Sequence, residues 1–563
     1  MKMKKKKLAS LFLASIMAMS TLVGCGSSSS GDSSSSSSES SSSVNSSSDN
    51  QATPVSSQEI TFALQNQYDN IDPGITINSF ANPFMVNLFE GLVAYDVDNN
   101  LVEGCAESWE ISDDGLTYTF TLRDGLKWSN GDDLTSEDFL YSYQRVLTPS
   151  TASQFGFIMT DYIYNAQEFT DGLVGADELG ISAPDEKTLV IQLKNVTPFF
   201  LDILAISAYY PVHQGIVEAN PDTWTLKADT YISNGPFMLD SLQFGENARL
   251  VKNPYYHDAD AVSLEALNLR FILEPSTALS AFESGEIQGS NTVPPADMTR
   301  LRSDSNSGLQ MASTFGLTYY VFNCLEEPLD DPKVRQALSL AIDRTAIIDN
   351  VLQTTDEPAT SLIPPGYIVD GVDFADGRSD FNIKPNANIE LAQELLAEAG
   401  YPNGEGFPTL RLGYYSDTVV KKVTEAMQQM WKDNLNIDTN IEVADWAVFY
   451  TDLQADDFDI GALGKSADFL NPLSFLLTAE SSNLLNIPNY RNPDYDEVFA
   501  EAMVTSDPDK AIQLMREAET ILMEDMSVLP LYYRTKTYML STNIEGFNYS
   551  PLGIPHFKYV KVN

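Results

Sequence analysis

The chain is long, strongly acidic and apolar enough to fold. It has 563 residues, of which 43% are hydrophobic and 10% aromatic, and 79 acidic against 33 basic side chains give a formal net charge of −46. A nucleic-acid-binding protein needs a basic face, so this charge argues against that class, whereas it fits a surface protein and modestly favours cationic over anionic ligands. Because the length exceeds what one hydrophobic core usually serves, two or three lobes are expected.

Residues 1–24 have the layout of a secretory signal peptide. Lysines within residues 2–7 precede an almost uncharged apolar stretch from Leu8 to Val23, which is too short for a lasting membrane span. The stretch ends at Gly24-Cys25 and resembles the bacterial lipobox. That resemblance implies that Cys25 receives a diacylglyceryl group and anchors the protein at the outer face of the cytoplasmic membrane. The alternative is an ordinary signal peptide with a chance cysteine.

Residues 25–57 are predicted to be the lipidated cysteine and a serine-rich tether. Such a segment has little apolar surface to bury and does not offset the entropy cost of ordering, so we expect it to be disordered. A flexible coil of about 30 residues would span roughly 30 Å.

The next clear element is an antiparallel hairpin over residues 109–123. Apolar Tyr118, Phe120 and Leu122 alternate with threonines after a turn at residues 112–115, which is typical of strands with one buried face. Beyond it, Thr135 and Asp138 predict the capping box of a helix that ends before Pro149.

Four later helices are predicted by apolar residues at helical spacing. One begins at Asp331-Pro332, one covers 392–399 and stops at Gly400, one covers 423–431, and one begins at Asp507-Pro508. Apolar runs at 188–193, 410–414 and 458–463 are typical of strands. This alternation predicts an α/β or α+β protein.

Motifs for catalysis or for cofactors do not stand out. The histidines His213, His257 and His556 have no metal-ligand spacing, and neither a GxSxG nor a GxxxxGK[ST] motif occurs. Cys105 and Cys324 either pair or remain lone thiols. With 79 carboxylates, a glycosidase-like pair is not excluded by counting, although nothing in the sequence supports one. We therefore expect a binding protein without a cofactor, and not an enzyme.

Seven segments are informative together: Asn87–Leu92, Ala106–Glu110, Tyr118–Arg123, Lys127–Gly131, Asn234–Phe237, Asp331–Leu338 and Leu395–Tyr401. In composition, spacing and order, over about residues 59–560, they resemble the signature of the bacterial family 5 extracellular solute-binding proteins. The resemblance implies an α/β, two-lobed hinged periplasmic-binding-protein-like fold (type II, cluster C) whose lobes close over the ligand.

The same resemblance implies the division of the chain. Lobe I would comprise 57–89, 220–317 and 534–563, an inserted domain 90–219, and lobe III 318–533. It also implies a monomer that works with the permease subunits of an ABC-type importer.

Residues 464–476 resemble the oligopeptide-binding branch of the family. That resemblance implies that Asp468 accepts the α-ammonium of a peptide and that Gly464 and Ser466 pair with its backbone. The chemistry is coherent, because an ammonium in a water-poor cleft needs a carboxylate and an extended peptide can add as a strand. The alternative for Asp468 is an ordinary loop acid ahead of a helix that starts at Asn471-Pro472.

Further contacts follow from the resemblance. Trp446 would form the wall of a pocket, unless it is a core tryptophan, and Ser79 and Phe155 would contact the ligand from the other side. Ala462 stands where members for short peptides place an arginine near the ligand's C-terminus, and Lys465-Ser466 replaces a Trp-Cys pair. Peptide length and C-terminal recognition therefore stay open.

Three alternatives to peptide import remain. The same fold would serve another nutrient, such as a dipeptide, an oligosaccharide or a metal chelate. A secreted lipoprotein hydrolase would need a catalytic pair. A receptor for peptide pheromones would differ in pathway more than in chemistry.

Overall fold

The computed structural model describes residues 58–563, apart from residues 69, 77–79, 97, 154, 370 and 484. The predictions for the signal peptide, for Cys25, for the tether and for Ser79 lie outside these residues. Among the described helices, none combines the length and the apolarity that crossing a membrane requires.

An 11-stranded mixed sheet is the largest feature of the fold. Its order is β17-β16-β18-β12-β19-β11-β1-β10-β9-β8, and β13 pairs with β19. The strands are β1 (Glu59–Leu64), β8 (Phe237–Gln243), β9 (Asn247–Lys252), β10 (Ala266–Phe271), β11 (Gly289–Ser290), β12 (Leu309–Phe322), β13 (Glu357–Pro358), β16 (Leu410–Tyr415), β17 (Thr439–Ala444), β18 (Ile460–Ser466) and β19 (Val528–Leu540). The predicted strands at 410–414 and 458–463 are β16 and β18.

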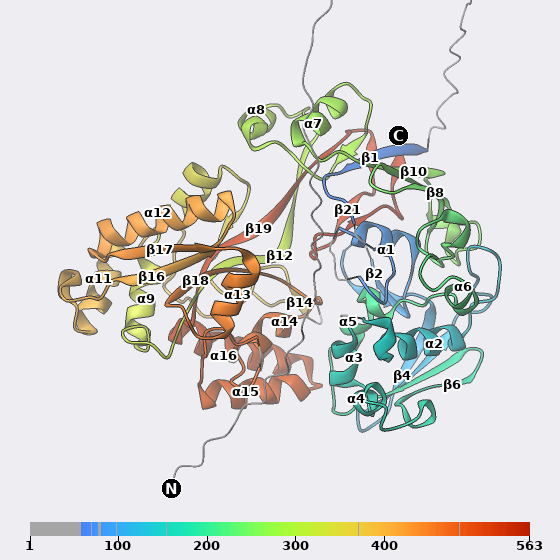
Figure 1. The fold of residues 1–563 in the computed structure, drawn as a ribbon, viewed down its shortest axis with the longest axis horizontal. Helices are drawn as coiled ribbons and strands as arrows, with labels where there is room; N and C mark the ends of the chain where they lie inside the picture. Colours follow the sequence, from blue (N-terminus) through green and yellow to red (C-terminus); the bar gives the residue numbers. More distant parts are fainter. Residues whose placement is uncertain are drawn as a thin grey trace, which may run out of the picture. The chain divides into compact units, whose positions relative to one another are not determined.

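The two long strands β12 and β19 join the two halves of this sheet. They run side by side and antiparallel (Figure 1), with a register shift between Ser313 and Leu317. One end of β19 pairs with β11, and the other end of β12 pairs with β18. Since 14 residues of strand reach about 46 Å, each is long enough to belong to both lobes. The predicted lobe boundaries at 317/318 and 533/534 fall inside these strands.

The half of the sheet that was predicted as lobe I takes its strands from both ends of the described chain. β1 pairs in parallel with β10 and β11, and β10, β9 and β8 complete this half of the sheet. Its helices are α1 (Asn82–Leu88), α7 (Pro275–Glu283) and α8 (Met298–Ser303). Two small C-terminal pairs, β20 (Ile544–Glu545) with β23 (Lys561–Val562) and β21 (Asn548–Tyr549) with β22 (Pro555–His556), pack here.

The first and last described segments are tied together directly. Gln58 donates its side-chain N–H to the Val562 carbonyl at 2.8 Å and accepts from the Val562 N–H at 3.1 Å. Phe557 packs edge-on against Phe62 of β1 with ring centroids 5.2 Å apart. Lobe I is therefore completed by the C-terminal residues.

Residues 90–219 contain a separate four-stranded sheet of order β4-β5-β7-β6. Its strands are β4 (Ala106–Ile111), β5 (Thr117–Leu122), β6 (Ile181–Asp185) and β7 (Thr188–Gln192), and the short β2 (Val93–Tyr95) and β3 (Leu101–Glu103) pair beside it. The helices are α2 (Ser136–Leu147), α3 (Gly156–Tyr162), α4 (Ala166–Thr170), α5 (Phe200–Leu204) and α6 (Gln214–Ala219). The predicted hairpin and the Thr135–Asp138 capping box are confirmed.

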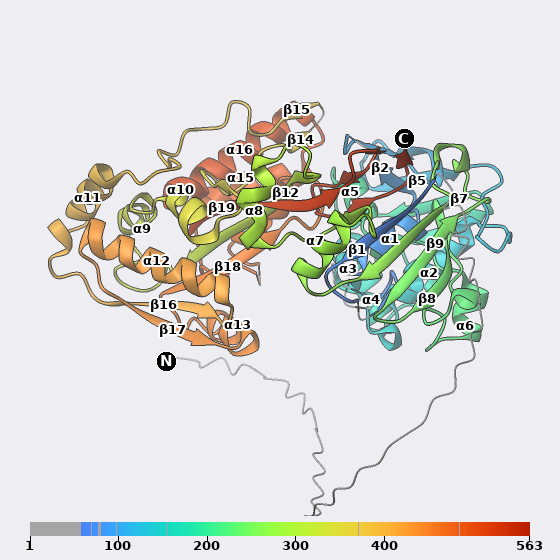
Figure 2. The ribbon, with the colours of Figure 1, turned by 90° about the horizontal axis from the view of Figure 1, so that it is seen from above.

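The residues predicted as lobe III contain eight of the described α-helices, of which α12 and α16 are the longest with 18 residues each. They are α9 (Pro332–Leu340), α10 (Arg344–Ala346), α11 (Ile389–Glu398), α12 (Thr418–Leu435), α13 (Trp446–Gln454), α14 (Leu473–Leu476), α15 (Pro493–Val504) and α16 (Pro508–Asp525), beside the small pair β14 (Ile368–Val369) and β15 (Val372–Asp373). Figure 2 shows α12 and α13 against β16 and β17. All four predicted helices are present. Asp331 and Asp507 cap α9 and α16 through backbone N–H groups, and Gly400 ends α11 at a φ of +98°.

Candidate functional site

β18 has one edge that is fully paired and one that is paired only at its start. β12 pairs along the whole strand, from Phe322 opposite Ile460 to Gly316 opposite Ser466. On the other edge, β16 pairs only with Ile460 and Gly461, and beyond Gly461 no strand within the described part of the chain continues the sheet. The last part of β18 therefore presents an open edge.

Gly464 and Ser466 turn their backbone groups toward this open edge. The Ala467 N–H donates to the Phe315 carbonyl at 2.8 Å, and the Asn323 N–H donates to the Asp459 carbonyl at 2.9 Å. Because hydrogen bonding alternates along an antiparallel pair, the odd-numbered residues of β18 bond to β12 and the even-numbered ones face away from it. Gly464 and Ser466 are both exposed. Their positions suit the predicted pairing with a peptide, which stays a prediction.

Asp468 lies two residues beyond β18 and holds an ion pair at the surface. Its Oδ2 is 2.8 Å from the Lys465 Nζ and accepts from the Ser474 hydroxyl at 3.3 Å, while the Asp468 N–H donates to that hydroxyl at 2.8 Å. The Asp468 side chain is 55% exposed. The Lys465 side chain is only 13% exposed, so the ion pair is half-buried, and an incoming ammonium that replaces Lys465 must outweigh the loss of a partly buried partner. Asp468 also contacts α14 through Ser474, and both its predicted ligand role and its alternative as an ordinary loop acid stay untested.

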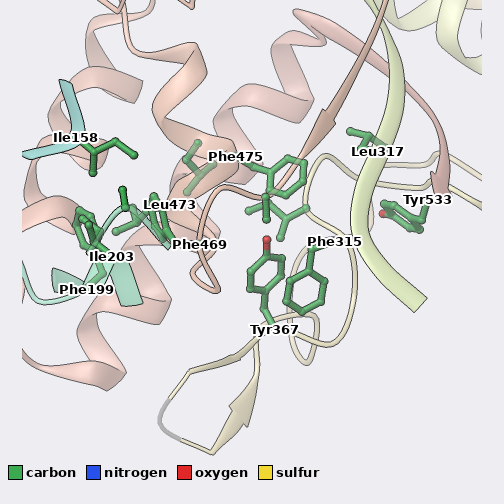
Figure 3. Close-up of a cluster of buried hydrophobic side chains, with 14 of the residues drawn as sticks. Ile158, Phe199, Ile203, Phe315, Leu317, Tyr367, Phe469, Leu473, Phe475 and Tyr533 are labelled. Atoms are coloured by element: carbon green, nitrogen blue, oxygen red, sulfur yellow. The ribbon is translucent and has the colours of Figure 1, made fainter. Parts of the chain in front are cut away.

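Phe469, the next residue, joins this loop to the inserted domain. Its ring stacks on Phe199 with centroids 5.4 Å apart and an interplanar angle of 10°, and Tyr162 meets Phe199 edge-on at 5.8 Å. Figure 3 shows Phe199 and Ile203 beside Phe469 and Leu473. The Asp468 loop therefore lies against residues 199–203, in the segment predicted to be the inserted domain.

The contact between the Asp468 loop and α5 also contains a buried carboxyl group. Asp202 of α5 accepts from the Tyr95 hydroxyl at 3.1 Å. Burial raises the pKa of Asp202 to about 7, against hydrogen bonds from Tyr95 and Asn471 that lower it. These residues line a cavity of about 490 Å³ between α5 and the segment before α14. Asp202 is therefore about half protonated at pH 7 and largely protonated below pH 6.

Trp446 begins α13 and is 52% exposed, so its interpretation as a core tryptophan is wrong. Its ring meets Tyr415 edge-on at 5.1 Å and stacks on Tyr450 at 5.3 Å. An exposed aromatic cluster of this kind suits a pocket wall, which stays a prediction. Phe155 directly precedes α3 and packs half-buried against the hydrophobic core, and its ligand role is likewise untested.

The sequence of this chain matches the family model of the bacterial extracellular solute-binding proteins, family 5 Middle, over residues 100–486. The chain belongs to that family. Its relatives include the oligopeptide-binding protein OppA of Bacillus subtilis (strain 168), which is 32% identical over 498 residues, or 87% of this chain and 90% of the relative.

Solved structures of family 5 relatives share the fold. The unliganded open form of the periplasmic murein tripeptide-binding protein MppA superposes with a TM-score of 0.79 at 29% identity, covering 90% of this chain and 98% of the other. Haemophilus influenzae OppA in complex with the peptide RPPGFSPFR gives 0.68 at 28% identity, covering 90% and 99%. These likenesses confirm the predicted two-lobed α/β fold.

Three cationic residues near the open edge were not predicted to have a functional role. Lys465 pairs with Asp468, and Arg534 and Lys536 stand on β19. Only the i, i+3 spacing of Lys465 and Asp468 was readable as a signal. Arg534 and Lys536 lie about 70 residues away in sequence, and their proximity depends on the order β18-β12-β19 in the sheet.

The remaining polar candidates do not add a second site. Cys105 and Cys324 are separate free thiols and form no disulfide. Over the described ranges, no group of three or more His, Cys, Asp and Glu side chains is arranged to hold a metal ion.

Proposed function

We propose that this family 5 protein captures oligopeptides outside the cytoplasmic membrane and delivers them to an ABC-type importer. The observation that carries the proposal is the open edge of β18. There the backbone N–H and C=O groups of Gly464 and Ser466 face away from β12, and Asp468 follows two residues later. An extended peptide adds to such an edge through main-chain hydrogen bonds.

The binding mechanism follows from this geometry. The α-ammonium of the peptide displaces Lys465 from Asp468, and the peptide backbone then runs along β18 past Ser466 and Gly464. Each main-chain hydrogen bond contributes about 0.5–1.5 kcal/mol whatever the side chains are, so many sequences can bind. The name of the Bacillus subtilis relative and the peptide complex of the Haemophilus influenzae relative support this ligand class.

Closure of the lobes couples binding to delivery. A peptide on β18 also contacts the inserted domain and lobe I across the cleft, and contacts to both sides stabilise the closed state. β12 and β19 are the strands through which the lobes would turn, because they are shared by both halves of the sheet. The permease then recognises the closed, loaded protein, which acts as a monomer.

The N-terminal segment would hold the protein at the outer face of the cytoplasmic membrane. Residues 1–24 direct secretion, Cys25 carries the lipid, and the serine-rich tether links it to the fold. A single acyl chain binds only marginally, whereas the two chains of a diacylglyceryl group hold a protein stably at a bilayer. In cells expressing the full chain, Cys25→Ser should move the protein from the membrane fraction to the medium or periplasm. Retention in the membrane would contradict the lipid anchor.

Calorimetry of the purified protein with peptides of three to six residues tests peptide capture. Peptides with a free N-terminus should bind, and N-acetylated copies should bind about 10- to 100-fold more weakly, because a charge-assisted hydrogen bond contributes about 1.5–3 kcal/mol. Asp468→Asn should remove this difference. Asp222→Asn, which neutralises an exposed carboxylate away from β18, is the matched control.

The same titrations decide among the alternatives. Equal binding of free and acetylated peptides would contradict the role of Asp468. Binding of a saccharide or a chelate that Asp468→Asn leaves unchanged would favour another nutrient, and release of products on prolonged incubation would favour a hydrolase.

A further inference from the structure

Arg534 reaches across the hinge strands to the open edge of β18. It stands on β19, and its side chain crosses β12, where Nε donates to the Thr318 hydroxyl at 3.1 Å and Nη2 donates to the Leu317 carbonyl at 3.2 Å. Thr318 faces Gly464 across the β12–β18 pair. The guanidinium therefore ends over the residue whose backbone groups face the open edge.

Two glycines leave the space that this arginine occupies. A Cβ atom on Gly464 would lie 1.7 Å from the Arg534 Nη2, and one on Gly316 would lie 3.3 Å from its Cδ. Real Cβ atoms do not approach other atoms to 1.7 Å, so a side chain at residue 464 would displace the guanidinium. The absence of a side chain at residue 464 leaves the guanidinium uncovered on that side.

Lys536 provides a second cation on the same side of β19. Residues two apart on a strand point to the same face. Lys536 lines a cavity of about 220 Å³ together with Ser466, Thr314 and Phe315, and its Nζ lies 5.8 Å from the centre of the Tyr549 ring. Burial lowers the pKa of Lys536.

Neither cation forms an ion pair: over the described residues, no carboxylate oxygen lies within 4.0 Å of the Arg534 guanidinium or of the Lys536 ammonium. Arg534 acts on the buried Asp356 carboxyl only from a greater distance, where it opposes the rise in the pKa of that group. By contrast, Arg145 pairs with Asp72 and Arg249 with Glu59. In a chain with a formal charge of −46, two adjacent cations without such a partner beside a binding edge indicate that the ligand supplies the anion.

We propose that Arg534 and Lys536 form a carboxylate-binding subsite, so that the protein favours peptides that carry an acidic group beyond their first residue. The inference rests on the proposed function, because it needs a peptide on β18. At this subsite the preference would be opposite to the one expected from the net charge, since charges inside a cleft act more strongly on a ligand than the distant surface charge.

The geometry places this carboxylate along the peptide. An added strand would lie about 4.8 Å from β18, with facing Cβ atoms about 5 Å apart. Gly464 is four residues from Asp468, or about 13 Å of strand, so the carboxylate belongs to about the third or fourth peptide residue. It is either the C-terminal carboxylate of a short peptide or the side chain of a Glu or Asp in a longer one. A guanidinium can bind either group through two parallel hydrogen bonds.

Calorimetry with six matched peptides tests the subsite. The peptides are Ala-Ala-Ala, its C-terminal amide, Ala-Ala-Glu-Ala-Ala-amide and Ala-Ala-Gln-Ala-Ala-amide, with Glu and Gln also moved to position 4. They are titrated into the wild-type protein, Arg534→Gln, Lys536→Gln and Arg300→Gln. The last removes a positive charge from an exposed arginine that pairs with Glu283 and Asp297.

We expect at least one carboxylate–amide pair to differ by roughly 10- to 100-fold with the wild-type protein and with Arg300→Gln. The difference should shrink to less than about threefold in Arg534→Gln, with a smaller reduction in Lys536→Gln. Loss of affinity on C-terminal amidation would identify the peptide terminus as the source of the carboxylate. Loss on replacing Glu by Gln would identify a side chain.

Two results would overturn the subsite. One is equal binding of all six peptides while dependence on the free N-terminus and on Asp468 persists, which leaves the proposed function standing. The other is an equal weakening of neutral and acidic peptides by Arg534→Gln, which would give the arginine a packing role only. Failure of every peptide to bind would overturn the proposed function as well.

Discussion

Gly464 contributes both to the proposed binding edge and to the packing of Arg534. Its backbone faces the open edge of β18, and its missing side chain makes room for the Arg534 guanidinium. The first role was predictable from the resemblance to the oligopeptide-binding branch. The second was not, because Gly464 and Arg534 become neighbours only when β12 brings β18 and β19 into one sheet.

Gly464→Ala should therefore impair binding more than folding. The new methyl group would push the guanidinium aside, at a cost of about 1–3 kcal/mol in the free energy of unfolding, and affinity for acidic peptides should fall with it. Denaturant unfolding and calorimetry measure the two effects. Gly215→Ala in α6, where the nearest atom to the new Cβ is 3.5 Å away, should be neutral or stabilising. Unchanged affinity for acidic peptides in Gly464→Ala would contradict this account of Arg534.

Lys465 competes with the ligand for Asp468. Lys465→Met removes the resident cation, so peptides with a free N-terminus should bind about two- to fivefold more tightly, the range that an ion pair of up to about 1 kcal/mol allows. N-acetylated peptides have no ammonium, and their affinity should not change. Parallel titrations of the two peptide forms measure the effect, and weaker binding of the free form would show that Lys465 assists the ligand.

At the scale of elements, helix caps and strand alternation were predictable from neighbouring residues, whereas the pairing of distant strands was not. Asp331 and Asp507 cap their helices, and Tyr118 and Phe120 alternate on β5, because these interactions span only a few residues. The pairing of β12 with β19 was not predicted. Its partners lie about 200 residues apart, and no local pattern records which strands become neighbours.

The contact of α5 with the segment before α14 should make stability depend on pH. Asp202 has a pKa of about 7 in the folded protein against an ordinary value of 3.8, so between about pH 4 and pH 7 the folded protein holds a proton that the unfolded chain has lost. Stability contributed by this group is therefore present below about pH 4 and is lost as the pH rises through 7.

Asp202→Asn, which stays neutral, should stabilise the protein at pH 8 by on the order of 2 kcal/mol and have little effect at pH 4. Thermal unfolding at the two pH values measures this difference, with Asp222→Asn as the control for a lost surface charge. An equal change at both pH values would show that Asp202 is ionised throughout.

At the scale of the whole molecule, the two-lobed fold was predictable because seven motifs in register resemble one family. The lobe boundaries remain predictions, although they fall within β12 and β19. The resemblance did not predict the proposed preference for an acidic ligand, because Arg534 and Lys536 belong to none of those seven segments.

Ligand binding should stabilise the whole molecule. A ligand at 100 times its Kd adds about 2.7 kcal/mol to the free energy of unfolding. In a protein of this size that corresponds to a rise of a few degrees in Tm. Differential scanning fluorimetry should show this rise with free peptides and a smaller one with N-acetylated copies at equal concentration. The same shift for both forms would contradict an ammonium site at Asp468.

The bond between Gln58 and Val562 also fixes an order of events during synthesis. A ribosome adds about 5–20 residues per second, so β1 precedes the C-terminal hairpins by roughly 25–100 s. β1 is paired on both edges as soon as β10 and β11 have emerged, but Gln58 and the Phe62 ring have no C-terminal partners until the last residues appear. Apolar surface that stays exposed in an incomplete fold favours aggregation. The last residues to appear therefore end the most vulnerable period in the life of the chain, although they lie far from Asp468 in the sequence.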